Sequence, residues 1–177
     1  ASLIHTYIGT GGNNIDTSYW SNFTLNIEDD FLINDVNVNI NIEGDPNTTK
    51  KYSYQVNYWD ELAIKISHNG LSTYLHIGQW ATASFVWIGH FDTTYDDEAF
   101  TKHPHTYANV TGSYKPDGNP LSIFDGVSTL GDWTLSIRDT SPWSGDKQVL
   151  KTWSIDVVQA VPEPSTLAIF ALGIMGL

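Results

Sequence analysis

The sequence predicts an all-β protein built as an antiparallel sandwich or barrel. Apolar side chains alternate with asparagine in INDVNVNINIEG at residues 33–44, and this period of two places the branched side chains on one face of a strand. Further stretches alternate in the same way, with turn-forming Gly, Pro and Asn between them. No convincing amphipathic helix precedes Val161, so a parallel sheet covered by helices is not expected.

The alternating stretches after residue 44 are expected to form the other strands. They are YSYQVNYW (52–59), ELAIKIS (61–67), STYLHIG (72–78), ASFVWIG (83–89), DWTLSIRD (132–139) and KTWSIDVV (151–158). Trp133 and Trp153 fall within two of these stretches. A large aromatic side chain in such a strand can fill the space between two sheets, so we expect both residues in the core rather than at a ligand.

Composition limits the classes of function. A chain of 177 residues is about one domain, and its 41% apolar content is enough for a packed core. The formal charge of −12 argues against nucleic acid as a partner, because phosphate binding requires many Lys and Arg side chains. The chain has no cysteine, which excludes disulfides, zinc thiolate sites and cysteine catalysis.

The last seventeen residues differ from the rest of the chain. Prolines in VPEPST end the sheet pattern, so a domain at residues 1–160 is expected to be followed by a separate tail at 161–177. A short apolar helix from Leu167 to Leu177 would span about 16 Å, roughly half of the hydrocarbon core of a bilayer. We therefore expect the tail to be a truncated membrane segment.

The tail resembles the bacterial PEP-CTERM sorting signal. Val161, Pro162, Glu163 and Pro164 match its opening motif, and the apolar run at 167–177 matches the part that follows, while the closing arginine run is missing. The resemblance implies export in a Gram-negative bacterium, transient anchoring in the inner membrane, recognition by an exosortase, and a final place at the cell surface or outside the cell. No secretion signal follows Ala1, so the sequence is expected to begin after signal cleavage or to be a fragment.

A second resemblance covers the body of the chain. The run GSYKPDGNPLSIFDGVSTLGDWTLSIRD at residues 112–139, an acidic segment before it and WSI at 153–155 follow the order of elements in the P domain, or Homo B domain, of proprotein convertases. The amino half matches more loosely, with His68 where the family usually has proline. The resemblance implies a jelly-roll-like β-sandwich of the galactose-binding-like kind, which accompanies a subtilisin-like serine endopeptidase and in some members binds calcium.

The acidic segment at residues 92–98 is the first candidate for a metal site. Clustered carboxylates repel one another unless they are solvated or share a cation, and calcium accepts six to eight oxygen ligands. The P-domain resemblance supports Asp96 and Asp97, with Asp92 and Asp139 as further candidates; a merely solvated loop is an equal alternative. The histidines of HPH at 103–105 are interpreted as a surface loop, because a transition-metal site needs a third convergent ligand.

Three functions remain open. No serine-hydrolase elbow or subtilisin segment is present, so we read the chain as non-catalytic. The preferred hypothesis is an exported binding or structural module of the P-domain kind, with calcium as a possible stabilising ion and the sorting tail as its address. One alternative is an accessory P domain that stabilises a neighbouring protease. A second alternative is a carbohydrate-binding jelly roll for exopolysaccharide, which predicts a row of exposed aromatic side chains.

Overall fold

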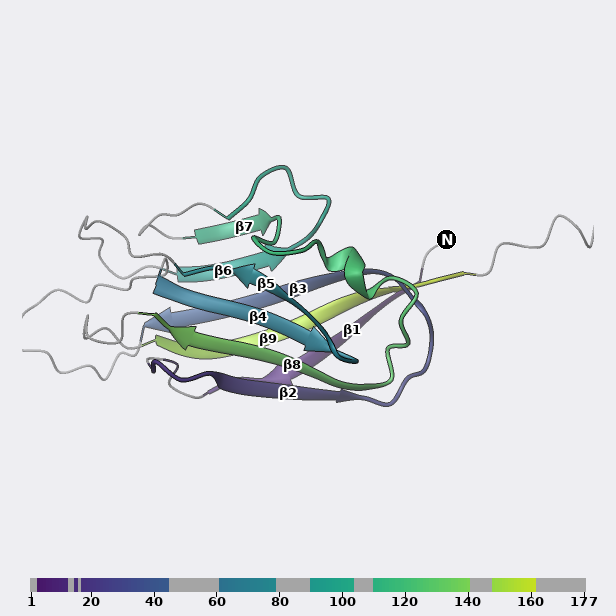
Figure 1. Cartoon of the computed structure of the whole chain (residues 1–177), viewed down its shortest axis with the longest axis horizontal. Coiled ribbons are helices and arrows are strands. Elements are labelled where there is room, and N and C mark those ends of the chain that lie inside the picture. Colours follow the sequence, from purple (N-terminus) through teal and green to yellow (C-terminus); the bar gives the residue numbers. More distant parts are fainter. Residues whose placement is uncertain are drawn as a thin grey trace, which may run out of the picture.

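A computed structural model describes residues 3–12, 15, 17–44, 61–78, 90–103, 110–140 and 148–161, which form two packed β-sheets (Figure 1). The five-stranded sheet contains, in spatial order, β1 (Ile4–Thr10), β9 (Gln148–Gln159), β3 (Ile33–Gly44), β6 (His90–Tyr95) and β7 (Val110–Tyr114). The four-stranded sheet contains β2 (Ser21–Ile27), β8 (Gly131–Asp139), β4 (Leu62–His68) and β5 (Leu71–His76). The predicted all-β sandwich is confirmed.

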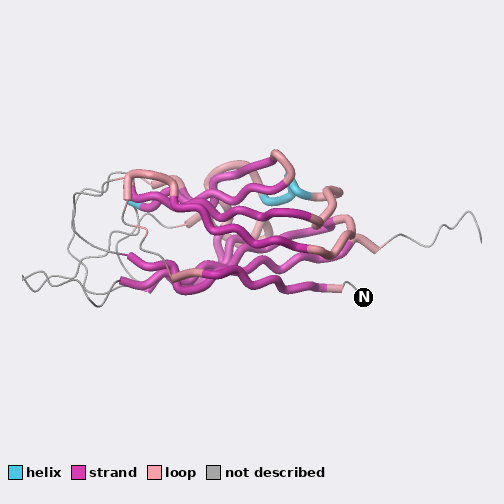
Figure 2. Tube along the Cα trace, turned by 90° about the horizontal axis from the view of Figure 1, so that it is seen from below, coloured by secondary structure: helices cyan, strands magenta, loops and turns pink. Residues whose placement is uncertain are grey.

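Most of the predicted strands are present. The alternating stretch at 33–44 is β3, and the stretches at 61–67, 72–78, 132–139 and 151–158 correspond to β4, β5, β8 and β9. The stretches at 52–59 and 83–89, and the helix expected at 167–177, lie outside the described residues. The described strands pair antiparallel with one exception, because β6 and β7 run parallel (Figure 1). Strands make up most of the described chain (Figure 2).

The core lies between the two sheets. The apolar residues of β3 alternate inward as the period of two requires, and Val36, Val38, Ile40 and Ile42 are each at most 1% exposed. Ile64 and Ile66 of β4 face them from the four-stranded sheet and are fully buried. A short 3-10 helix, η2 (Leu121–Phe124), buries Leu121 and Phe124 beside β3 and joins the same core.

The asparagines of β3 form part of a polar ladder on the outer face of the five-stranded sheet. Asn39 donates to Oδ2 of Asp156 at 2.8 Å and accepts from Oγ1 of Thr94 at 2.7 Å. Thr6 donates to the other carboxylate oxygen of Asp156 at 2.6 Å. These bonds connect β1, β9, β3 and β6 across the solvent side of the sheet, so the polar half of the alternation also pairs the strands.

Strand β9 leads directly toward the tail. It lies between β1 and β3 and pairs with both. The backbone N–H of its last residue, Gln159, donates to the carbonyl of Leu3, and that of the next residue, Ala160, donates to the carbonyl of Leu32. Val161 follows and is 62% exposed. Among the described residues, no helix has the length and apolar character needed to cross a bilayer.

Trp153 of β9 packs directly over Gly9 of β1. The two residues are register partners, and a Cβ added at Gly9 would overlap the indole ring. The glycine is therefore required by close packing, since Trp153 is only 1% exposed and cannot move outward.

We expect Gly9→Ala to lower the free energy of unfolding by about 1–3 kcal/mol, because the new methyl group overpacks the core. Thr10→Ala is the matched control on the exposed side of the same strand and should cost less than about 1 kcal/mol. Urea unfolding of the two variants measures both. Equal stability of the Gly9 variant and the wild type would show that Trp153 adjusts without cost.

Candidate functional site

Five carboxylates gather near the ends of β6 and η2, and we call them the acidic cluster. Its members are Asp35, Asp96, Asp97, Glu98 and Asp125. Asp35 lies in β3 at a β-bulge against β9, Asp96 to Glu98 form the turn after β6, and Asp125 follows η2. The turn is visible in the sequence as a run of acidic residues. Asp35 and Asp125 join it only through the fold, since they lie far from it in the chain.

Burial, hydrogen bonding and the neighbouring charges hinder the ionisation of three members of the cluster. Burial, followed by repulsion from Asp96 and Asp97, raises the pKa of Asp35 above its usual value, against a hydrogen bond from the backbone of Val36 that lowers it. Burial and the charges of Asp35 and Asp97 likewise raise the pKa of Asp125. A hydrogen bond with Asp96 is the main cause that raises the pKa of Glu98. Protonation or a nearby cation would relieve the repulsion among these carboxylates.

Asp97 also has a structural role. Its two carboxylate oxygens accept hydrogen bonds from the backbone N–H groups of Leu121 and Ser122, at 2.7 and 2.8 Å. These groups open η2, so the carboxylate satisfies donors that have no partner inside the helix. Asp96 similarly accepts from the backbone N–H of Glu98 at 2.8 Å, which shapes the turn.

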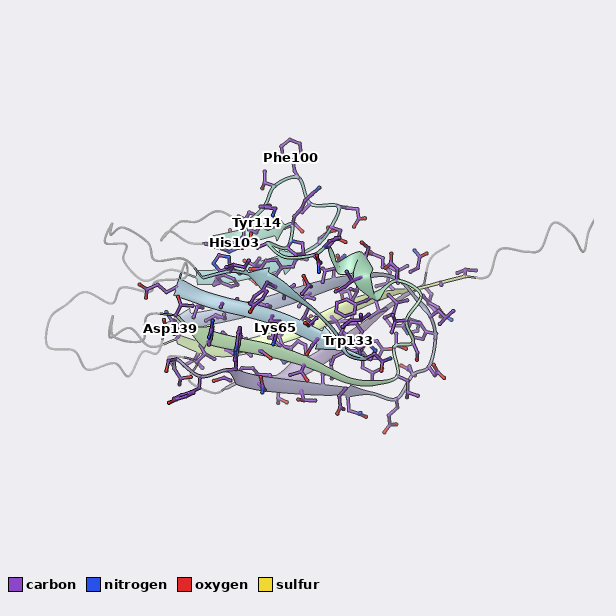
Figure 3. All side chains as sticks on the ribbon, in the orientation of Figure 1. Lys65, Phe100, His103, Tyr114, Trp133 and Asp139 are labelled. Carbon is purple, nitrogen blue, oxygen red and sulfur yellow. The ribbon has the colours of Figure 1, made fainter. Side chains whose placement is uncertain are left out.

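The four carboxylates nominated from the sequence do not meet at one point. Asp92 is an exposed residue within β6, on the face that carries Thr94. Asp139 is 1% exposed at the far end of β8, where it pairs with Leu62, and Figure 3 shows it at the opposite end of that strand from Trp133. Within the described ranges, no three His, Asp or Glu side chains are arranged to hold a metal ion.

Trp133 lies at the centre of a buried aromatic contact. It is fully buried, it donates from Nε1 to the carbonyl of Thr129 at 3.2 Å, and His68 stacks on it with ring centroids 4.1 Å apart. The nitrogens of His68 lie 3.0 Å from the carbonyl oxygen of Asp132 and 2.7 Å from that of Ser128. A carbonyl only accepts, so the ring donates to one oxygen when neutral and to both when protonated.

His103 is buried, and the interpretation of residues 103–105 as a surface loop is wrong for this residue. It is 3% exposed, and its ring lies 4.3 Å from that of His76 and 5.3 Å from those of Phe91 and Tyr114. Figure 3 shows His103 next to Tyr114. An imidazole can pack like an aromatic ring. The polar residue type therefore led us to predict a surface position for a residue that lies in the core. His105 lies outside the described residues.

The outer face of the four-stranded sheet carries an aromatic and cationic group that sequence reasoning missed. Trp20, which precedes β2, lies over this face with Nζ of Lys65 4.9 Å and Cζ of Arg138 4.7 Å from its ring centroid. Tyr74 is next to it, with ring centroids 6.3 Å apart, and is 37% exposed. We call Trp20, Lys65, Arg138 and Tyr74 the Trp20 group. Because its members come from four segments, no local motif signals it.

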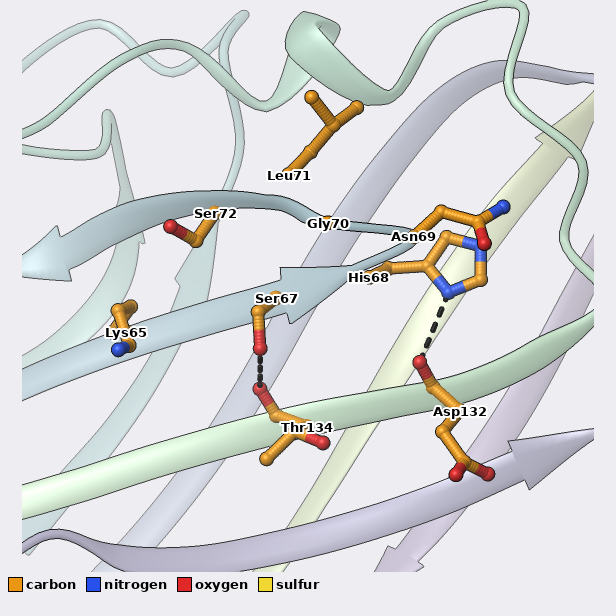
Figure 4. Close-up of a pocket in the computed structure, with 9 residues that line it drawn as sticks. All are labelled: Lys65, Ser67, His68, Asn69, Gly70, Leu71, Ser72, Asp132 and Thr134. Atoms are coloured by element: carbon orange, nitrogen blue, oxygen red, sulfur yellow. Dashed lines mark hydrogen bonds between the residues drawn. The ribbon is translucent and has the colours of Figure 1, made fainter.

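A shallow groove of about 360 Å³ begins at Lys65 and runs along the same face (Figure 4). Its other lining residues come from β4, the turn at Asn69 and Gly70, β5 and β8, and they are mostly polar: Ser67, His68, Asn69, Gly70, Leu71, Ser72, Asp132 and Thr134. Hydroxyl and amide groups along a hydrated surface can bind a polar ligand through hydrogen bonds.

Comparison with known proteins identifies the tail. The PEP-CTERM protein-sorting motif matches residues 160–177, which confirms the resemblance read from the sequence. The motif marks an exported protein that is sorted through the cell envelope of a Gram-negative bacterium by way of an exosortase, with the tail as a transient membrane anchor. No curated protein matches the chain.

Two solved structures are similar to the body of the chain. One is a chain from the crystal structure of the complex of Aeromonas sobria serine protease (ASP) with the chaperone (ORF2), with 12% sequence identity and a TM-score of 0.47 over 91% of this chain. The other is the crystal structure of the serine protease of Aeromonas sobria, with the same identity and TM-score over 90% of this chain. The chain spans 27% of the length of either match.

We expect Asp35→Asn to raise the melting temperature at pH 7, because it removes a carboxylate whose charge is disfavoured first by burial and then by the charges of Asp96 and Asp97. The folded pKa of Asp35 lies above the usual value of 3.8, so wild-type stability decreases as pH rises from about that value through the folded pKa. The advantage of the variant should therefore shrink toward pH 4. Melting curves across this range measure it, and a variant less stable than wild type at pH 7 would contradict the repulsion described here.

Proposed function

We propose that the chain is a non-catalytic binding or structural module of the P-domain kind, displayed at the cell surface after sorting through its tail. The observation that carries the binding role is the Trp20 group with its adjoining groove, which together offer one continuous polar and aromatic surface on the four-stranded sheet. The tail supplies the address, since β9 runs directly into the sorting motif.

The non-catalytic reading is supported by what the candidate chemical groups bond to. Asp97 binds backbone amides of η2, and His68 lies between two backbone carbonyls. Asp117 accepts from the backbone N–H of Ile77 at 2.9 Å and lies 3.1 Å from Nδ1 of His76. These side chains therefore contribute to the fold through the hydrogen bonds that they make.

The P-domain kind is supported by where the motif residues lie. Leu121, Phe124, Trp133 and Trp153 are each at most 1% exposed, so the shared pattern consists of core positions. The same observation keeps the accessory role as a second candidate, in which the sandwich stabilises a subtilisin-like protease domain. Co-purification of such a protease with the native protein would favour that role over independent display.

Calcium stabilisation remains a prediction, and we propose to test it at the acidic cluster, although no three carboxylates among the described residues are arranged to hold a metal ion. A divalent cation there would relieve the repulsion among Asp35, Asp125 and their neighbours. We expect calcium, relative to a chelator, to raise the melting temperature by mass action, with a stabilisation of about 2.7 kcal/mol at a hundredfold excess over Kd.

The double variant Asp35→Asn with Asp125→Asn should lose this calcium effect, while Asp92→Asn on the exposed face of β6 should keep it. Asp97 is left intact because its substitution would remove the cap of η2 and lower stability by itself. An unchanged wild-type melting curve with calcium would make the cluster a solvated and repulsive feature only.

Surface display is tested in a host that has an exosortase, with an export signal placed before the chain. We expect the folded domain to be labelled by antibody on intact cells. The triple variant Pro162→Ala, Glu163→Ala and Pro164→Ala should remain in the inner-membrane fraction instead, because the motif that the sorting enzyme reads is lost. The same distribution for both proteins would contradict sorting through this motif.

A further inference from the structure

The Trp20 group concentrates positive charge in an acidic protein. The chain has 8 Lys and Arg residues against 20 Asp and Glu, yet Lys65 and Arg138 approach the same indole ring. They lie on neighbouring strands two register positions apart, since Ala63 pairs with Arg138 and Lys65 with Ser136. Like charges so placed on one face of a sheet repel each other.

Neither cation is neutralised by a carboxylate in the part of the chain that the structure describes. Nε of Arg138 is a buried atom with no hydrogen-bond partner there. By contrast, Lys151 on the five-stranded sheet pairs with Glu43 at 3.2 Å. A cation–π contact attracts an ammonium or guanidinium group without cancelling its charge, so Lys65 and Arg138 remain able to bind an anion.

The surroundings favour a ligand with many hydroxyl groups. Trp20 and Tyr74 provide aromatic rings with an apolar surface next to water, to which the apolar face of a sugar ring can pack. The groove that starts at Lys65 continues past Ser67, Ser72 and Thr134. One face of the sheet thus carries aromatic rings that can pack against a sugar, cations that can bind a carboxylate, and hydroxyl groups that can form hydrogen bonds.

We propose that this face binds a carboxylated saccharide, that is, an oligosaccharide containing uronic acid units. Lys65 and Arg138 bind its carboxylates, with the planar guanidinium able to make two parallel bonds to one of them. The aromatic rings pack against the sugar, and the groove takes the adjoining units. This inference rests on the proposed binding role and names the class of ligand for it.

The test is isothermal titration of the whole chain with tetragalacturonate, in a buffer with a chelator so that calcium does not bridge carboxylates. Maltotetraose, which is neutral, and an oligoglutamate of equal charge are titrated in parallel. We expect tetragalacturonate to bind at least tenfold more tightly than either. Absence of binding, equal binding of maltotetraose, or equal binding of the oligoglutamate would each overturn the proposal.

Variants locate the site. Lys65→Gln and Arg138→Gln should each weaken tetragalacturonate binding by about tenfold or more, while Lys151→Gln removes the same charge from the other sheet and should change it less than twofold. Melting curves confirm that each variant is folded. Equal losses from all three substitutions would show general charge attraction and overturn the site. Surface display is measured separately, so failure here leaves the proposed sorting and display intact.

Discussion

The packing around Trp133 is the interaction on which one end of the sandwich depends. The indole contacts His68 from β4 on its face and lies 5.1 Å, between ring centroids, from Phe124 of η2. Its N–H donates to the carbonyl of Thr129, within the segment that runs alongside residues 31–33 at the start of β3. This one side chain therefore contacts the end of the β4–β5 hairpin, η2 and the segment that leads to β8. Because it packs against η2, it also helps to position the backbone amides that donate to Asp97.

The two outer faces of the sandwich use polar residues differently. On the five-stranded sheet, Thr6, Asp156, Asn39 and Thr94 bond to one another, so their hydrogen-bonding groups serve the sheet itself. On the four-stranded sheet, the cations of the Trp20 group contact a ring and keep their charge. On the five-stranded sheet these side chains bond to one another, whereas on the four-stranded sheet Lys65 and Arg138 can still bind a ligand.

The sequence was sufficient for the sandwich because burial imposes a period of two wherever one face of a strand is covered. It failed for β1, whose pattern is inverted: Ile4 and Ile8 are 62% and 72% exposed, while His5 and Tyr7 point to the half-buried side. Strand β7 is short and contains Gly112 at a φ of 126°, which carries no strand signal.

Sites were harder to predict than strands, because they join residues that are distant in the chain. The turn at Asp96 and Asp97 is visible as a local run of charge, but Asp35 reaches it only through the pairing of β3 with β6. Trp20, Lys65 and Arg138 meet for the same reason and share no motif. Contacts of this kind become visible only when strand order and register are known.

The position of β9 has a mechanical consequence. A load applied to the tail enters the domain at Val161 and acts along a strand that is bonded on one side to β1 and on the other to β3. A load along the strand must shear two rows of backbone hydrogen bonds together, whereas the same load on an edge strand would act on one row. Gln159 also bonds to Leu3, so the start of β1 lies beside the point where the load enters. A protein held by its tail is thus attached through a strand that is bonded on both sides within its five-stranded sheet.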